Sequence, residues 1–259
     1  MTTTVLTETR ANVAVLTLNR PDSANTLDLA MGRDLLAAAL QCEADPAVRA
    51  VVLTGAGKNF CFGGDLRGMV SGGAPIEAYL RELTTHLHAA IARFMRMDAP
   101  VIAAVNGTAA GAGVGLVAMA DLAIAGAGSK ISLAYTGVGL TPDGGTSFLL
   151  PRAVGAKRAA ELILTNRVLT ADEALAWGLV NQVAPDDAVL DAALKLAGKL
   201  AAGPKGAFGK SKRLLAASLG ALESQLSAES ETIAAQAASA EGREGIAAFL
   251  EKRKAQYPG

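Results

Sequence analysis

The stretch PVIAAVNGTAAGAGVGLVAMAD, residues 100–121, decides how the chain can be interpreted. Its first six residues are an apolar run that predicts a buried strand. The glycines and alanines that follow predict a helix over residues 111–119, packed close to the end of that strand. Between the strand and the closing Asp121 there is no ionisable side chain. Any chemistry at this point must therefore come from the backbone.

A second glycine-rich segment, TGAGKNFCFGGDLRGM at residues 54–69, also follows a predicted strand and leads into a predicted helix. The first N–H groups of a helix have no intrahelical partner, and small residues let a ligand approach them. The N–H groups of Gly64 and Ala112 are therefore candidates for an oxyanion hole, which holds a carbonyl oxygen as negative charge develops on it. The alternative is that these glycines only permit close packing of a helix on a sheet.

The remaining sequence predicts an α/β fold, because strand and helix patterns alternate as they do around a largely parallel sheet. Two strands are expected around a turn at Ala11 and Asn12, followed by a helix over residues 27–42 with a cap at Asn25-Thr26. From residue 186 onward the chain is predicted to be helical. Further strands are predicted at residues 50–57, 122–126, 130–134 and 179–183, and further helices at 76–97, 144–153, 156–164 and 171–177.

Composition narrows the class of protein. The 259 residues are 51% hydrophobic, enough for one large core, and carry 24 basic and 24 acidic side chains. This balance gives no electrostatic footprint for nucleic acid or an anionic membrane. Two cysteines, Cys42 and Cys61, are too few for a disulfide framework, and the N-terminus shows no signal-peptide pattern. We therefore expect a cytoplasmic protein that binds neither nucleic acid nor membrane.

Several common sites are not predicted. The segment GAGVG has the spacing G-x-G-x-G, whereas a dinucleotide site needs G-x-G-x-x-G, and no nucleoside-triphosphate loop is present. His86 and His88 are two residues apart on a predicted helix and so point in different directions, which disfavours a metal site. No histidine is expected in a position to activate a nucleophile. We predict no metal.

Six motifs carry a resemblance to a known family. In chain order they are LTLNRPDSANTL, GKNFCFGGDL, PVIAAVNGTAAGAG, VGLTPDGGTSFLLPRAVG, AWGLVNQV and EGIAAFLEKRKAQY. They resemble successive signatures of the enoyl-CoA hydratase/isomerase, or crotonase, family and span nearly the whole chain. The resemblance implies a ββα spiral core with a C-terminal helical trimerisation region. On this basis we expect residues 1–199 to form the catalytic core and residues 200–259 to pack within a homotrimer or hexamer.

The same resemblance implies an acyl-CoA thioester as the substrate, with coenzyme A entering as part of that substrate and no separate cofactor. The thioester carbonyl would lie between the N–H groups of Gly64 and Ala112. Lys252 is similar to a family lysine that reaches the CoA phosphates of a neighbouring subunit, and Tyr135 would line the substrate site. The residues implied to contact the CoA nucleotide are Ala24, Cys61, Gly63, Asp65, Leu66 and Arg67.

Departures from the family pattern indicate the reaction. The hydratases carry two glutamates at places that fall here on Gly115 and Tyr135, so the pair that activates water and delivers a proton is absent. Asp143, in GLTPDGG, resembles the aspartate that several isomerases of the family use, including one acting on the ring epoxide of phenylacetyl-CoA. A double-bond shift needs one base and an oxyanion hole. The sequence therefore favours an enoyl-CoA or ring-epoxide isomerase.

Three alternatives stay open at this point. Asp143 could cap the helix expected to start at Gly144, as aspartate before a helix often does. The protein could be a hydratase that lacks the usual glutamate pair, or an acyl-CoA-binding relative without turnover. Asp65 and Asp121 are interpreted as structural, the first at a helix start and the second opening a strand.

Overall fold

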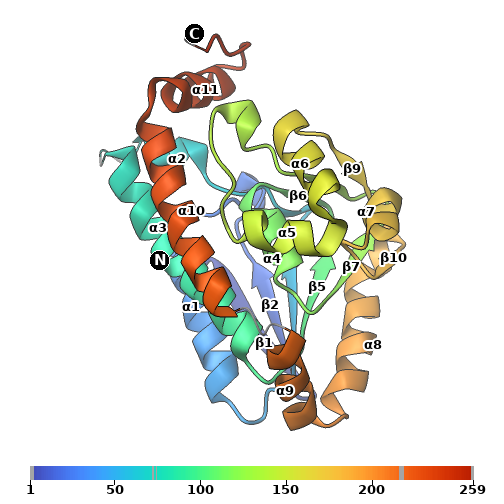
Figure 1. Cartoon of the computed structure of the whole chain (residues 1–259). Helices are drawn as coiled ribbons and strands as arrows, with labels where there is room; N and C mark the ends of the chain where they lie inside the picture. Colours follow the sequence, from blue (N-terminus) through green and yellow to red (C-terminus); the bar gives the residue numbers. More distant parts are fainter. Residues whose placement is uncertain (1–2, 72, 74, 216–218, 258–259) are drawn as a thin grey trace.

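The computed structural model describes residues 3–71, 73, 75–215 and 219–257. Within them the strands form two sheets, one of six strands in the order β1-β2-β3-β5-β7-β10 and one of four in the order β4-β6-β8-β9 (Figure 1). Helices cover both faces of the larger sheet. The predicted α/β class is confirmed. None of the helices in this described part of the chain is long and apolar enough to cross a membrane.

The six-stranded sheet is antiparallel at one edge and parallel elsewhere. Strands β1 (Val5–Arg10) and β2 (Val13–Leu18) form the predicted hairpin, whose turn residues Ala11 and Asn12 both have positive φ angles. Each following pair in the sheet is parallel, as the alternation of strands and helices predicts. These strands are β3 (Ala50–Gly55), β5 (Val101–Val105), β7 (Leu122–Gly126) and β10 (Gln182–Ala184).

The small sheet repeats one local pattern. A short strand follows each of three strands of the large sheet: β4 (Asn59–Cys61) follows β3, β6 (Thr108–Ala110) follows β5, and β8 (Lys130–Ser132) follows β7. The ninth strand, β9 (Leu169–Thr170), pairs with β8 in the antiparallel sense. Helices follow two of the short strands, α2 (Leu66–Ser71) after β4 and α4 (Ala112–Ala118) after β6. The repeated strand–strand–helix unit therefore brings the starts of α2 and α4 to the same end of the small sheet.

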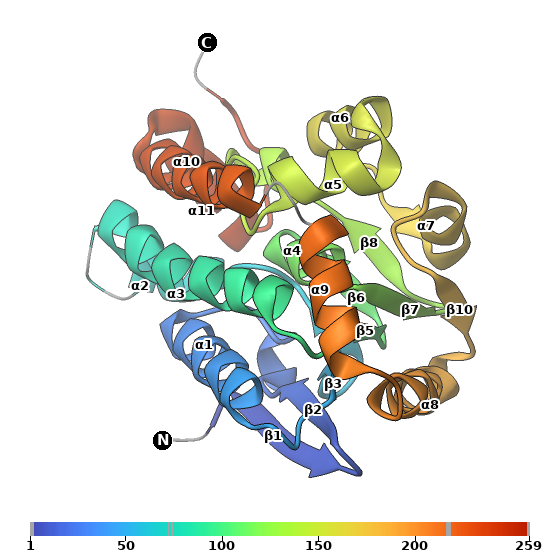
Figure 2. The same ribbon diagram turned by 60° about the horizontal axis from the view of Figure 1, so that its bottom comes forward.

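Alternate residues of the large sheet face two different layers. One face packs on α1 (Leu29–Ala44) and α3 (Ile76–Arg96) in the main core, through residues such as Leu16 and Leu53. The other face packs on α8 (Val189–Ala201) through residues such as Val15 and Val52. Figure 2 shows α1, α3 and α10 (Leu219–Ala238) as neighbouring helices. The remaining helices are α5 (Thr146–Val154), α6 (Ala156–Thr165), α7 (Ala171–Trp177), α9 (Lys205–Leu215), α11 (Ala240–Leu250) and the short η1 (Pro21–Ser23), η2 (Thr136–Val138) and η3 (Asp186–Ala188).

Two sequence predictions about helix ends are wrong. Helix α1 starts at Leu29 and is capped by Asp28, whose side chain accepts a hydrogen bond from the N–H of Met31. The expected cap, Asn25, is fully buried, and its side-chain amide donates hydrogen bonds to the carbonyls of Ala56 and Asn59. The other shifted end belongs to α5, which starts two residues later than expected.

The C-terminal helices find partners within the same chain, contrary to the expectation that they need another subunit to pack on. Helix α10 lies along α3 and buries Leu222, Leu226 and Ile233 in the main core. Helix α9 is attached to the core by Lys212, which pairs with Asp121 at 2.6 Å. Because α10 packs in the main core, residues 200–259 do not have a core of their own. We keep the boundary at residue 199 as a proposal that separates a catalytic region from an assembly region.

Candidate active site

Two glycine-rich loops meet through their backbones. A Cβ atom placed on Gly63 would lie 2.8 Å from the carbonyl oxygen of Ala110 and 3.2 Å from the nitrogen of Ala112. Gly63 also has a φ angle of +80°, which side-chain-bearing residues rarely adopt. A glycine is therefore required here, because the loop after β4 lies directly against the loop before α4.

The two predicted N–H donors come from these adjoining loops. Leu27 donates to the carbonyl of Gly63 and accepts from the N–H of Asp65, so the N–H of Gly64 points away from this bridge. Ala112 is the first residue of α4, and the N–H of such a residue has no intrahelical partner. Within the described residues, neither the Gly64 N–H nor the Ala112 N–H donates a hydrogen bond.

Arg20 fixes the loop that follows β4 through ion pairs and a hydrogen bond. The Arg20 guanidinium lies 2.9 Å from Asp65 and 3.3 Å from Asp28, and it also donates to the carbonyl of Thr26. The second carboxylate oxygen of Asp65 accepts from the N–H of Gly68 in α2. Asp65, one residue after Gly64, thus makes structural contacts at the start of α2, as the sequence analysis proposed.

Asp143 lies in a third loop, which presses on the start of α4. A Cβ atom on Gly144 would come within 3.3 Å of the Ala112 side chain, and one on Gly115 within 2.2 Å of the Gly144 carbonyl oxygen. Asp143 is only 5% exposed. The structure therefore packs together the three loops that carry Gly64, Ala112 and Asp143, residues that the sequence singled out separately.

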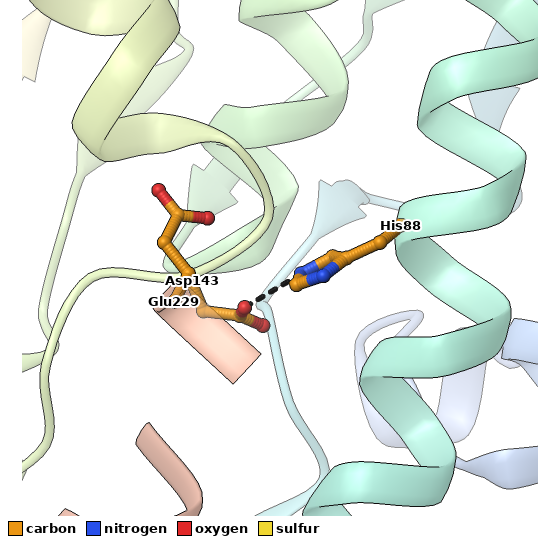
Figure 3. A group of neighbouring side chains, drawn as sticks. All are labelled: His88, Asp143 and Glu229. Atoms are coloured by element: carbon orange, nitrogen blue, oxygen red, sulfur yellow. Dashed lines mark hydrogen bonds and ion pairs between the residues drawn. The ribbon is translucent and has the colours of Figure 1, made fainter. Parts of the chain in front are cut away.

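The side chain of Asp143 is hydrogen-bonded to a histidine that the sequence analysis set aside. Its Oδ1 atom lies 2.7 Å from Nε2 of His88, a buried residue of α3 (Figure 3). From the sequence we considered His88 only as a metal ligand or as the activator of a nucleophile, and so missed its contact with Asp143. Helical spacing contained the signal: Leu80, Thr84, His88 and Ile91 follow one another at intervals of four, four and three residues, and all are buried.

A glutamate from α10 is the third member of this group. Glu229 is 3% exposed and accepts hydrogen bonds from the N–H of Gly145 at 2.7 Å, the N–H of Ser147 at 2.9 Å and the Ser147 hydroxyl. It thereby caps α5, whose own N-cap residue, Gly145, has no side chain to do so. The interpretation of Asp143 as a side-chain cap is wrong, because its carboxylate is turned toward His88.

Burial and charge act against each other in this group. Burial lowers the pKa of His88, but the carboxylates of Asp143 and Glu229 act in the opposite direction and leave that pKa above its ordinary value. For Glu229, burial and the neighbouring Asp143 raise the pKa. Tyr135 donates its hydroxyl hydrogen to the Asp143 carbonyl, and burial raises the pKa of this phenol well above its ordinary value. Tyr135 is therefore a neutral donor at physiological pH.

The same three side chains are of the types that bind divalent metals. One ligand atom from each of His88, Asp143 and Glu229 lies within 4.8 Å of the others. In this arrangement, however, His88 is bonded directly to Asp143, and both oxygens of Glu229 accept hydrogen bonds from α5. Each of these side chains therefore already has hydrogen-bond partners, either within the group or at the start of α5.

The residues implied to contact CoA lie around the first loop and at the C-terminus. Ala24 adopts a left-handed conformation and its carbonyl accepts from the N–H of Phe62. Cys61 is buried, which raises the pKa of its thiol to about 12 and leaves it unsuited to act as a nucleophile. Leu66 is half-buried and Arg67 is exposed at the start of α2. Lys252 is exposed in the turn that follows α11, a helix that contacts α2.

Comparison with known proteins bears directly on this site. The family model described as enoyl-CoA hydratase/isomerase matches residues 8–259. The chain is 37% identical to the 1,2-epoxyphenylacetyl-CoA isomerase of Escherichia coli, with 98% of each chain covered. It is 39% identical to a probable enoyl-CoA hydratase of Rhodobacter capsulatus, over 99% of this chain and 98% of the relative. It is also 35% identical to a 4-chlorobenzoyl coenzyme A dehalogenase of Arthrobacter, over 93% of this chain and 88% of the relative.

A solved structure agrees over the same length. The crystal structure of an enoyl-CoA hydratase/isomerase from Pseudoalteromonas atlantica superposes with a TM-score of 0.88 at 33% identity, covering 98% of this chain and all of that one. The family model and the relatives span the converging loops as well as the C-terminal helices. The chain therefore belongs to the enoyl-CoA hydratase/isomerase, or crotonase, family of acyl-CoA enzymes.

Proposed function

We propose that this protein is an acyl-CoA isomerase that moves a double bond, or rearranges a ring epoxide, with Asp143 as its base. The observation that supports it best is the position of the Asp143 loop: Gly144 packs on Ala112, and the Ala112 backbone in turn packs on Gly63, the residue before Gly64. The proposal takes the Asp143 carboxylate and the N–H donors of Gly64 and Ala112 to act on one bound thioester. This is the set of groups that enolate chemistry on a thioester requires.

For a 3-enoyl-CoA the proposed steps are as follows. The thioester oxygen lies between the N–H groups of Gly64 and Ala112. The Asp143 carboxylate takes a proton from C2, and the electron pair released spreads over a dienolate whose oxygen is stabilised by the two N–H groups. Protonated Asp143 then returns a proton to C4, which gives the 2-enoyl-CoA and restores the carboxylate. His88 holds Oδ1 of Asp143, which leaves Oδ2 for the proton transfer.

Hydration is the less favoured reaction in this site. Adding water across a double bond needs one group to activate the water and another to deliver a proton to carbon. A carboxylate at position 115 would have no room, since even a Cβ atom there would lie 2.2 Å from the Gly144 carbonyl oxygen. At position 135 there is a buried neutral phenol.

A second candidate reaction is suggested by His88. A double-bond shift does not require a histidine beside the base, whereas hydrolytic substitution does benefit from one. In that reaction the Asp143 carboxylate would displace a halide from the acyl group and form an ester, and a water deprotonated by His88 would then hydrolyse it. One relative named for dehalogenation of 4-chlorobenzoyl coenzyme A is similar over most of the chain.

The CoA contacts and the assembly belong to the same proposal. The nucleotide would lie along Ala24 and the loop from Cys61 to Arg67, with Lys252 reaching the phosphates bound by a neighbouring subunit of a trimer or hexamer in the cytoplasm. Exposed apolar side chains at the end of α9 and on α11, Leu215 and Phe249, are available for such contacts. Light scattering should give at least three chains per particle, and a stable active monomer at micromolar concentration would contradict this assembly.

The deciding experiment is a panel of CoA thioesters followed by mass-resolved product analysis. The panel contains 3-enoyl-, 2-enoyl-, ring-epoxide and 4-halobenzoyl-CoA. Isomerisation of a 3-enoyl or ring-epoxide substrate, with deuterium entering C2 in heavy water, is the expected result. Halide release from the last substrate would favour the substitution reaction, and water addition to the 2-enoyl substrate would favour a hydratase. Tight binding of all four without turnover would leave a non-catalytic acyl-CoA-binding protein.

A further inference from the structure

Helix α5 begins without any capping side chain of its own. Its N-cap is Gly145, and both Gly144 and Gly145 have positive φ angles, so the turn from Asp143 into the helix is made of bare backbone. The first N–H groups of a buried helix need acceptors, because a buried N–H without a partner is destabilising. Those acceptors come from Glu229, 84 residues further along the chain.

Glu229 is held in place by the packing of α10. The helix lies on α3, where the Ser230 and Thr84 hydroxyls are 2.5 Å apart, and Gln225 donates to the same Ser147 hydroxyl that Glu229 binds. Leu226 and Ile233 anchor the helix in the core on either side. The carboxylate of Glu229 is therefore fixed relative to both α3, which carries His88, and the loop that carries Asp143.

We propose that Glu229 is a positioning residue for the Asp143–His88 pair. It fixes the backbone of the residues that follow Asp143 and supplies a second negative charge facing His88. The inference rests on the proposed function in one respect, because it takes Asp143 to be the working base. The helix α10 would in this way form part of the active site without touching the substrate.

The charge of Glu229 has a definite electrostatic consequence. Asp143 from its loop and Glu229 from α10 lie against His88. Arg81 of α3 and Glu223 and Glu231 of α10 line the same groove of about 540 Å³ as His88. The last three are exposed and largely screened, whereas Glu229 is buried. Removing the charge of Glu229 should therefore lower the pKa of His88, and an exposed charge on the same helix should not matter.

The chain offers a clean measurement, because it contains two histidines. Selective labelling gives one imidazole signal from His88 and one from His86, a half-buried residue two positions away that serves as an internal reference. In Glu229→Gln the NMR titration midpoint of His88 should fall by about one pH unit, while that of His86 stays in place. Glu223→Gln is the matched control: it removes an exposed carboxylate of α10, paired with Arg96, and should move neither.

Activity supplies the second readout. With a 3-enoyl-CoA, kcat should fall about tenfold in Glu229→Gln and about 100-fold in Glu229→Ala, with KM and CoA-thioester affinity within about threefold of wild type. If protonation of His88 gives a limb in the pH profile of kcat, that limb should shift with the NMR midpoint of His88. Glu223→Gln should retain the wild-type kcat.

Each result has one interpretation. A His88 midpoint and kcat that both stay at wild-type values in Glu229→Gln would overturn the inference. Loss of thioester binding and thermal stability in proportion to kcat would reduce Glu229 to a structural cap, which also overturns it. If the wild-type protein isomerises nothing, the proposed function fails by itself. The His88 titration then decides alone whether Glu229 governs the pair.

Discussion

Replacing Asp143 by asparagine tests the assignment of the base most directly. The substitution keeps the shape of the side chain and an oxygen that can accept from Nε2 of His88, but it removes the ability to take a proton. Loss of a positioned general base costs about 10²- to 10⁴-fold in rate, which corresponds to about 3–5 kcal/mol in the activation free energy. Affinity for the thioester should change little, because in the proposed mechanism its carbonyl is bound at Gly64 and Ala112.

The same variant has a calculable effect on stability. A buried hydrogen bond to a charged group contributes about 1.5–3 kcal/mol. Because the pKa of His88 is higher in the folded protein than in the unfolded chain, the pair stabilises fully below about pH 6.5 and loses that contribution as pH rises through the folded value. The free energy of unfolding of Asp143→Asn should therefore lie furthest below wild type in mild acid and approach it in mild alkali.

The assay combines turnover of a 3-enoyl-CoA, deuterium exchange at C2, thioester binding by calorimetry, and urea unfolding at about pH 6 and about pH 9. Asp187→Asn, at an exposed aspartate of η3, is the control and should match wild type throughout. If Asp143→Asn isomerises within about tenfold of wild type, the assignment is refuted, and a bound water becomes the candidate base.

Three further predictions follow from contacts described above. Ala112→Pro removes the N–H donor and should lower kcat at least about 100-fold, whereas Ala112→Gly keeps the donor and should be mild; steady-state kinetics with parallel thioester binding checks this, and the opposite ranking would refute a backbone donor. Gly115→Ala places a Cβ atom 2.2 Å from the Gly144 carbonyl and should lower both thermal stability and activity, so a wild-type melting temperature would contradict the contact. Lys212→Met leaves Asp121 without its 2.6 Å partner and should cost about 3 kcal/mol by urea unfolding. The double variant with Asp121→Asn should recover part of that loss, and no recovery would mean that packing rather than charge is responsible.

The sequence could predict those parts of the site that lie in short contiguous motifs. Gly64 and Ala112 each follow an apolar strand and open a helix, and Asp143 lies in a recognisable loop. His88 and Glu229 escaped because each acts through a tertiary contact, 55 residues from Asp143 in one case and 84 residues from Gly145 in the other. The spacing of buried residues on α3 indicates that His88 faces the core, but only the packing of α3 and α10 against the Asp143 loop gives His88 and Glu229 their partners.

Tertiary contacts also explain why the predictions about the cap of α1 and the packing of α10 were wrong. Asparagine is a residue type that often caps helices. The Asn25 side-chain amide instead donates to the carbonyls of Ala56 and Asn59, and Asp28 caps α1. The alanine-rich sequence of α10 offers few large apolar side chains, so we expected this helix to pack on another subunit. Small side chains instead let it lie close to α3, where the chain itself provides the partner.

The contact between Gly115 and Gly144 also limits how this protein can change over evolutionary time. A glutamate at position 115 and the present course of the Asp143 loop exclude each other sterically, since the two positions compete for the same volume. A descendant that acquired the glutamate first would displace the loop that carries Asp143, the proposed base. A glutamate at position 115 therefore requires an earlier change in the loop after Asp143, and the order of substitutions is set by this one approach of two backbones.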